Sequence, residues 1–140
     1  MKCEIRNEQK YLKINRTLLR KLFAFLGRRY GRDHTETVSV YLVDNSGIAA
    51  LNEQYLGHAG PTDVLAFPLG DSGVLGDIVV SVERACEQCL GDDAQRELLF
   101  LLIHGFLHLC GHVDYNDSDK RRMLKEGDHA LKEFLTAYGK

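Results

Sequence analysis

The 140-residue sequence has no tryptophan, only two prolines and no apolar run that could cross a membrane. A membrane-spanning helix needs about 20 consecutive apolar residues, and the strongest apolar run, Leu98–Ile103, ends at His104. The first residues also lack the apolar segment of a secretory signal peptide. We therefore expect a cytoplasmic protein without a membrane partner, whose four cysteines stay reduced.

Several catalytic signatures are missing as well. The sequence contains no Walker phosphate-binding loop, no G-x-S-x-G nucleophile elbow and no dinucleotide-binding G-x-G-x-x-G. A hydrophobic content of 44% with 27% charged residues is typical of a folded globular protein. No linker, repeat or low-complexity segment divides residues 1–140, so we expect a single domain.

Acidic residues are absent from one long stretch, although the net charge of the chain is −2. Between Lys10 and Arg32 there are eight basic residues and no Asp or Glu. Apolar residues at helical spacing place the basic residues on the opposite side of an expected helix. This basic side is either an ordinary solvated face or a surface that attracts phosphate groups, and the sequence alone leaves both interpretations open.

Apolar periodicity predicts a mixture of helices and strands in one compact unit. The expected strands are 3–7, 36–44, 62–68 and 75–83, and the expected helices are 15–31, 46–56, 83–90, 94–112 and 117–139. The helix over 94–112 is apolar on nearly all sides, so we expect it at the buried centre of the fold.

Two histidines interrupt that apolar helix. His104 and His108 are four residues apart, which puts both imidazoles on one face of a helix, where they can bind a single Zn²⁺. A pair at this spacing can also be incidental, stacked or hydrogen-bonded. Burying two polar rings is costly unless they have partners, however, and no neighbour in the sequence supplies one. We therefore favour a metal site.

A third ligand is expected beyond Gly111, where a glycine can end the helix and turn the chain back. Two residues compete for this role: His112 would continue the four-residue spacing, whereas Asp114 lies past the turn. We favour Asp114, because a ligand six residues after the second histidine is typical of extended zincin motifs. His58 precedes an expected strand and could border the site.

The residue after His104 is Gly105, where a peptidase with an H-E-x-x-H motif has its general base. A peptide hydrolase also needs an acid for the leaving amine, whereas a phosphodiester's leaving oxygen can be stabilised by a metal and nearby cations. Gly105 therefore disfavours a zinc peptidase and leaves metal-assisted phosphodiester hydrolysis open. No general acid or base can be assigned from the sequence.

Three linked blocks resemble the YbeY family of bacterial endoribonucleases. "HGFLHLCGHVD" matches the pattern H-G-x-L-H-L-x-G-x-x-H, "PTDVLAFP" matches P-T-D-V-L-S-F-P, and "GDIVVS" matches G-D-I-x-I-S. The resemblance implies a zincin-like α+β fold with a mixed four-stranded sheet, about five helices and a central metal-binding helix. It also implies one Zn²⁺ per chain, held here by His104, His108 and Asp114.

The same resemblance implies cleavage of single-stranded RNA, maturation of the 3′ end of small-subunit (16S) rRNA, ribosome quality control and contact with the small ribosomal subunit. The chain departs from the family at Asp114, which replaces a third histidine, and at Leu56, where the family often has arginine. Both changes keep a second hypothesis open, an assembly or RNA-binding factor with a largely structural zinc site. The sequence does not define an oligomeric state.

Overall fold

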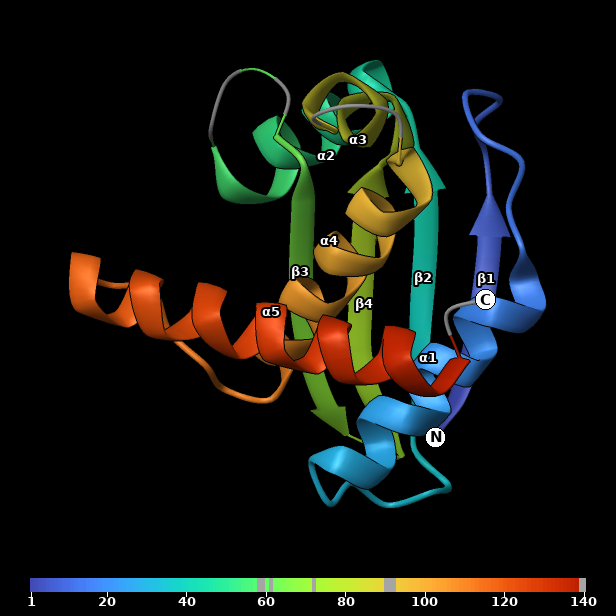
Figure 1. The fold of residues 1–140 in the computed structure, drawn as a ribbon. Helices are drawn as coiled ribbons and strands as arrows, with labels where there is room; N and C mark the ends of the chain where they lie inside the picture. The colour runs from blue at the N-terminus through green and yellow to red at the C-terminus, as the bar shows by residue number, and fades with distance from the viewer. Residues whose placement is uncertain (58–59, 61, 72, 90–92, 139–140) are drawn as a thin grey trace.

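The computed structural model describes residues 1–57, 60, 62–71, 73–89 and 93–138 of the chain (Figure 1). Within these residues there are four strands and five helices. The strands are β1 (Lys2–Asn7), β2 (Thr37–Val43), β3 (Val64–Asp71) and β4 (Val74–Ser81). The helices are α1 (Arg16–Arg29), α2 (Asn45–Leu56), α3 (Val82–Gln88), α4 (Ala94–Leu109) and α5 (Asp117–Tyr138). The expected α+β class is therefore confirmed.

The four strands form one mixed sheet in the order β1-β2-β4-β3. β1, β2 and β4 are parallel, whereas the edge strand β3 is antiparallel to β4. Parallel neighbours need a long crossover connection, and α1 supplies it between β1 and β2. β2 and β4 are consequently the two inner strands, and most of their residues are buried.

One face of this sheet is covered by α1, α4 and α5, while α2 and α3 lie near the end where β4 finishes (Figure 1). Because side chains alternate along a strand, Ile78 and Val80 both point toward the three covering helices and are completely buried. α4 lies in the middle of this layer, and its Phe106 meets Phe23 of α1 with ring centroids 6.2 Å apart. The expectation that this helix forms the buried centre is confirmed.

The opposite face is covered less completely. Val43, Leu65 and Val79 pack with Ile48 of α2 in a second, smaller apolar cluster. An open cavity of about 480 Å³ lies beside this cluster, lined by Arg6, Glu8, Tyr41, Val43, Leu51, Tyr55, Phe67, Asp77 and Val79. Burial raises the pKa of the Asp77 carboxyl. This face therefore keeps charged groups beside a hollow, whereas the other face is closed by helices.

No helix within the described residues has the length and apolar character needed to cross a membrane. All four cysteines lie in described parts of the chain, and none is in a disulfide. Burial raises the pKa of the Cys3 thiol to about 12, so this thiol is not prone to ionise.

Candidate metal centre

The two histidines of the predicted site lie near the C-terminal end of α4. The helix begins after Asp93, whose side chain accepts a hydrogen bond from the backbone N–H of Arg96 and so caps the first turn. His104 and His108 then lie one turn apart on the same side of the helix. Their ring centroids are 4.8 Å apart and the ring planes meet at 83°. The structure thus brings the two imidazoles together, as expected.

The helix ends earlier than the sequence suggested. Its last residue is Leu109, so the prediction of helix through residue 112 was wrong for the final three positions. Gly111 has a left-handed backbone with φ of 95°. The N–H groups of Gly111 and His112 donate hydrogen bonds to the carbonyls of His108 and Leu107, each at 3.0 Å. This pair of bonds defines a Schellman turn, which accounts for glycine at the left-handed position.

Beyond the turn, the chain brings Asp114 back toward the histidines. The distance from Oδ2 of Asp114 to Nε2 of His108 is 3.9 Å. His112 lies differently: its Nδ1 is 3.2 Å from the carbonyl oxygen of Leu107, and its ring meets Tyr30 edge-on with centroids 6.4 Å apart. Of the two candidates for a third ligand, Asp114 is the one beside His108. Its binding of a metal stays a prediction.

His104 has an environment that keeps its imidazole neutral. Burial lowers its pKa and the neighbouring imidazole of His108 lowers it further, while the carboxylates of Asp63 and Asp114 act in the opposite direction. The ring of Phe100, one turn earlier, stacks on His104 with centroids 6.3 Å apart. Nδ1 of His104 is buried, and no described residue forms a hydrogen bond with it. An unpartnered buried nitrogen is costly, so this atom is suited to bind a ligand.

The donor chemistry fits a zinc ion, because neutral imidazole and carboxylate are both normal zinc ligands. The three side chains do not yet surround a common point. Within the described ranges, no group of three His, Cys, Asp or Glu side chains is arranged to hold a metal ion. His104 and His108 belong to a packed helix, whereas Asp114 follows a turn. To bring all three side chains around one metal ion, Asp114 would therefore have to move toward the two histidines.

Packing explains why Gly105 stands where zinc peptidases have glutamate. A Cβ at this position would lie 2.7 Å from Cγ2 of Ile78 and 3.2 Å from Cγ2 of Val64. α4 can approach β3 and β4 this closely because residue 105 has no side chain. A glutamate here would collide with the sheet, so the position belongs to the packing surface and offers no room for a general base.

The family model described as Endoribonuclease YbeY matches residues 4–135 of the chain. The chain belongs to the YbeY family. Endoribonuclease YbeY of Carboxydothermus hydrogenoformans is 39% identical over 134 residues, which cover 91% of this chain and 94% of the relative. Endoribonuclease YbeY of Bacillus subtilis is 36% identical, with coverage of 84% and 82%. The solution structure of TM1509 from Thermotoga maritima has a TM-score of 0.67 at 29% identity and covers 97% of this chain and 91% of that chain.

Membership of the YbeY family confirms the resemblance based on three sequence blocks. The block "PTDVLAFP" leads into β3 and places Asp63 among the charges that act on His104. Sequence reasoning used this block for recognition and missed both Asp63 and the stacking of Phe100. Phe100 could have been found, because it lies four residues before His104 on the same helix. Asp63 gives no such signal, because it reaches the site only when β3 packs beside α4. Leu56 is the last residue of α2 and is 47% exposed, and His58 lies outside the described residues.

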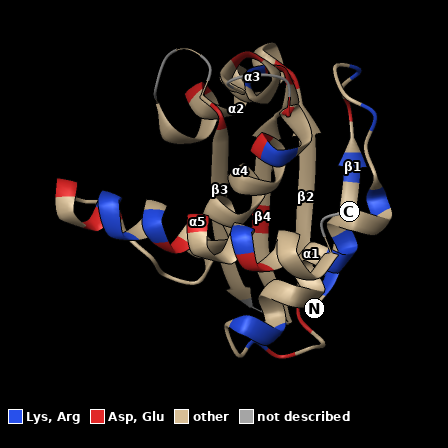
Figure 2. Ribbon diagram, in the orientation of Figure 1, with Lys and Arg blue, Asp and Glu red and all other residues tan. Residues whose placement is uncertain are grey.

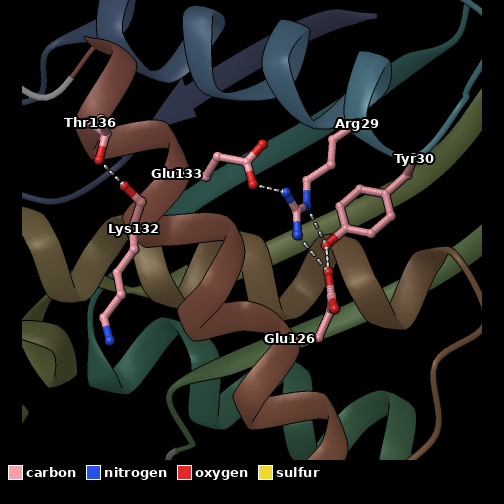
Figure 3. Close-up of polar contacts among 6 residues, drawn as sticks. All are labelled: Arg29, Tyr30, Glu126, Lys132, Glu133 and Thr136. Carbon is pink, nitrogen blue, oxygen red and sulfur yellow. Dashed lines mark hydrogen bonds and ion pairs between the residues drawn. The ribbon is translucent and has the colours of Figure 1, made fainter.

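A polar network joins the end of α1 to α5 (Figure 3). Arg29 donates a hydrogen bond to Glu126 at 3.2 Å and also pairs with Glu133, while the Tyr30 hydroxyl donates to Glu126. The bond from Tyr30 holds the pKa of Glu126 below its ordinary value, and burial raises the pKa of Tyr30 to about 12. Because the Tyr30 ring also contacts His112, the network holds the outgoing side of the turn.

Proposed function

We propose that the chain is a metal-dependent endoribonuclease that cleaves single-stranded RNA, with His104, His108 and Asp114 holding one Zn²⁺. The observation that carries this proposal is the Gly111 turn, which leaves a carboxylate 3.9 Å from the second of two neighbouring imidazoles. The names of the YbeY relatives support RNA cleavage as the reaction class.

When bound, zinc would act as a Lewis acid and make a water molecule more acidic, with a pKa of about 7 in catalytic sites. The chain's own residues prepare the ligands. Burial and His108 keep His104 neutral, so that its nitrogen lone pair is free, and the stacked Phe100 ring limits its rotation. Asp114 adds one negative charge, which makes the site less electron-withdrawing than three imidazoles would.

We place the activity in the cytoplasm, in maturation of the 3′ end of small-subunit rRNA and in ribosome quality control, with the small subunit as partner. Support for these finer points is the family resemblance.

The direct test is cleavage of a fluorescent single-stranded RNA by purified protein. We expect cutting that stops with a chelator, and a loss of at least about 100-fold for His108→Ala, since even outer-shell changes cost 10–100-fold. His34→Ala is a matched control, because its side chain is 92% exposed. Cutting that survives chelation or His108→Ala would contradict the proposal.

Zinc affinity tests the ligand assignment separately. A competition assay with a zinc-binding dye should show weaker binding for His104→Ala, His108→Ala and Asp114→Ala, and nearly unchanged binding for His112→Ala. If only His112→Ala lost zinc affinity, the third ligand would be His112 and not Asp114.

Exposed Leu56, in place of the family's arginine, favours a second candidate function, an assembly or RNA-binding factor with a largely structural zinc. An arginine at this position could hold a phosphate, and leucine cannot. This alternative predicts no RNA cleavage but cosedimentation with the small subunit, retained by a folded His108→Ala variant.

A further inference from the structure

The charge of this chain is strongly segregated. The segment from Lys10 to Arg32 contains eight of the 18 Lys and Arg residues and none of the 20 Asp and Glu residues. The remaining chain therefore has ten cations and 20 carboxylates, although the whole is nearly neutral. Figure 2 shows the same division in space: basic residues follow α1 and the loop before it, whereas basic and acidic residues alternate along α5.

Six of these cations form what we term the basic stripe: Lys10, Lys13, Arg16, Arg20, Lys21 and Arg28. All six are exposed, and none lies within 4.0 Å of a carboxylate among the described residues. The cations that follow directly are different. Arg29 pairs with two glutamates of α5 and Arg32 pairs with Glu36. Arg16 and Arg28 donate hydrogen bonds to the Ile5 carbonyl and the Tyr138 hydroxyl, but no described carboxylate neutralises the charge of the basic stripe.

The spacing of the basic stripe suits an extended polyanion. Arg16 and Arg20 lie on successive turns of α1, and Arg28 is about 18 Å from Arg16 along the helix axis at 1.5 Å per residue. Lys13 and Arg16 border a shallow hollow of about 470 Å³. A second hollow of about 370 Å³ is lined by Lys2, Cys3, Glu4 and Arg20, among others. Cations repeated at this distance can contact several phosphates of one strand.

The other side of α1 excludes insertion into a lipid bilayer. Basic amphipathic helices bind membranes by placing their apolar face among the lipids. In α1 that face is already used, because Leu19, Leu22 and Phe23 are at most 1% exposed in the main core. What remains available to a partner is charge alone, and this favours a phosphate backbone.

Apart from the proposed Zn²⁺, the side chains of the metal centre supply no such charge. The charged groups that shift the pKa of His104 are His108, Asp63 and Asp114, two of which are carboxylates. The Zn²⁺ would attract the phosphate that reacts, but the neighbouring phosphates of the strand need cations from elsewhere. α1 leads toward the site, since Tyr30, directly after its last residue, contacts His112 in the turn that carries Asp114.

We infer that the basic stripe is the surface that binds the sugar-phosphate backbone of single-stranded RNA and leads the strand to the Gly111 turn. This inference rests on the proposed function for the identity of the polyanion. It adds that substrate is held mainly by α1, at a distance from the reacting centre.

The test is RNA affinity measured against salt. A labelled single-stranded RNA is titrated by fluorescence anisotropy, with chelator present, at several KCl concentrations. The variant combines Lys13→Gln, Arg16→Gln, Arg20→Gln and Lys21→Gln, since glutamine keeps helix propensity. The matched control combines Lys120→Gln, Arg121→Gln, Arg122→Gln and Lys125→Gln, exposed residues of α5 with the same total charge.

Each lost phosphate contact lowers the salt slope by about 0.7 for a single strand, so the α1 variant should lose a slope of about 3 and bind at least about tenfold more weakly. The α5 control should keep most of the slope. Equal losses in both variants, or no loss in the α1 variant, would overturn the inference. Circular dichroism confirms that each variant is folded.

Two further outcomes separate this inference from the proposed function. If RNA binding depends on the basic stripe but no cleavage occurs, the inference holds and the endoribonuclease proposal fails. If cleavage occurs and the RNA affinity of the α1 variant is unchanged, the endoribonuclease proposal holds and the inference fails. Binding of anionic phosphatidylserine vesicles that is lost in the α1 variant, without an effect on RNA, would reassign the surface to a membrane.

Discussion

The two faces of the sheet differ in how closely helices pack against them and in whether they carry charged side chains. Residues of β4 alternate between them: Ile78 and Val80 lie under the helices, while Asp77 and Val79 line the cavity on the other side. The helix-covered face is so tight that α4 needs a glycine against Ile78. The open face keeps a carboxyl whose pKa burial raises. The close approach of a helix at Gly105 thus lies on the side that bears the histidines, where it fixes their helix.

The largest effect should follow from forcing a carboxylate into the tight face. Gly105→Glu would restore the peptidase motif, but overpacking and an unpaired buried charge should destabilise the fold by about 4 kcal/mol or more. Urea denaturation measures this loss. Gln95→Glu, at an exposed position of the same helix, should be nearly neutral. A stable Gly105→Glu variant that hydrolyses peptides would contradict the packing explanation.

Substitution of two neighbouring valines of β4 compares the packing of the two faces directly. Val80→Ala should cost about 2–3 kcal/mol, because it leaves a cavity under rigid helices. Val79→Ala removes the same atoms beside an open hollow into which neighbours can relax, and should cost about 1 kcal/mol less. Urea denaturation of both variants checks the difference. Equal costs would show that the open face is as tightly packed as the other.

A smaller effect is expected at the turn on the helix-covered side. Gly111→Ala places a side chain at a left-handed position, which costs about 1–2 kcal/mol, and should also weaken zinc binding because Asp114 shifts. Gly31→Ala is the control, since Gly31 has φ of 64° with free space around it. It should cost similar stability and leave zinc affinity unchanged. Equal zinc affinity in both variants would show that the turn at Gly111 does not position Asp114 for metal binding.

The smallest change should come from Tyr30→Phe, which removes the hydrogen bond donated to Glu126 and the long one accepted from Arg29 at 3.3 Å, with a net cost of about 1 kcal/mol. Glu126 has a lowered pKa in the fold, so its contribution is present at neutral pH and is lost as the pH falls through that lowered pKa. Tyr30 has a pKa raised to about 12. Its contribution is complete below its ordinary pKa of about 10 and is lost as the pH rises toward 12.

The stability difference between wild type and Tyr30→Phe should therefore shrink at both acidic and strongly alkaline pH. Thermal melts across pH measure it, and a difference that does not change with pH would show that the bond to Glu126 contributes nothing.

Local patterns predicted the helices, the strands and the pair of histidines, because each depends on residues a few positions apart. The final helix shows this: it was expected from residue 117, and Asn116 caps it there by accepting a hydrogen bond from the N–H of Asp119. The overshoot of α4 to residue 112 arose because apolar periodicity continues past the point where Gly111 turns the chain. Asp63, the strand order and the cavity depend on contacts between distant segments, which periodicity does not encode.

The order of the strands and helices along the chain has a consequence for its synthesis. All four strands are complete at Ser81, before any residue of α4 has been made. Until then the face that carries Ile78 and Val80 lacks its central cover, and exposed apolar strands associate readily with other chains. A chain that stops before Ala94 should therefore aggregate even though its sheet is complete. The helix that carries the histidines is also the element that protects the nascent sheet.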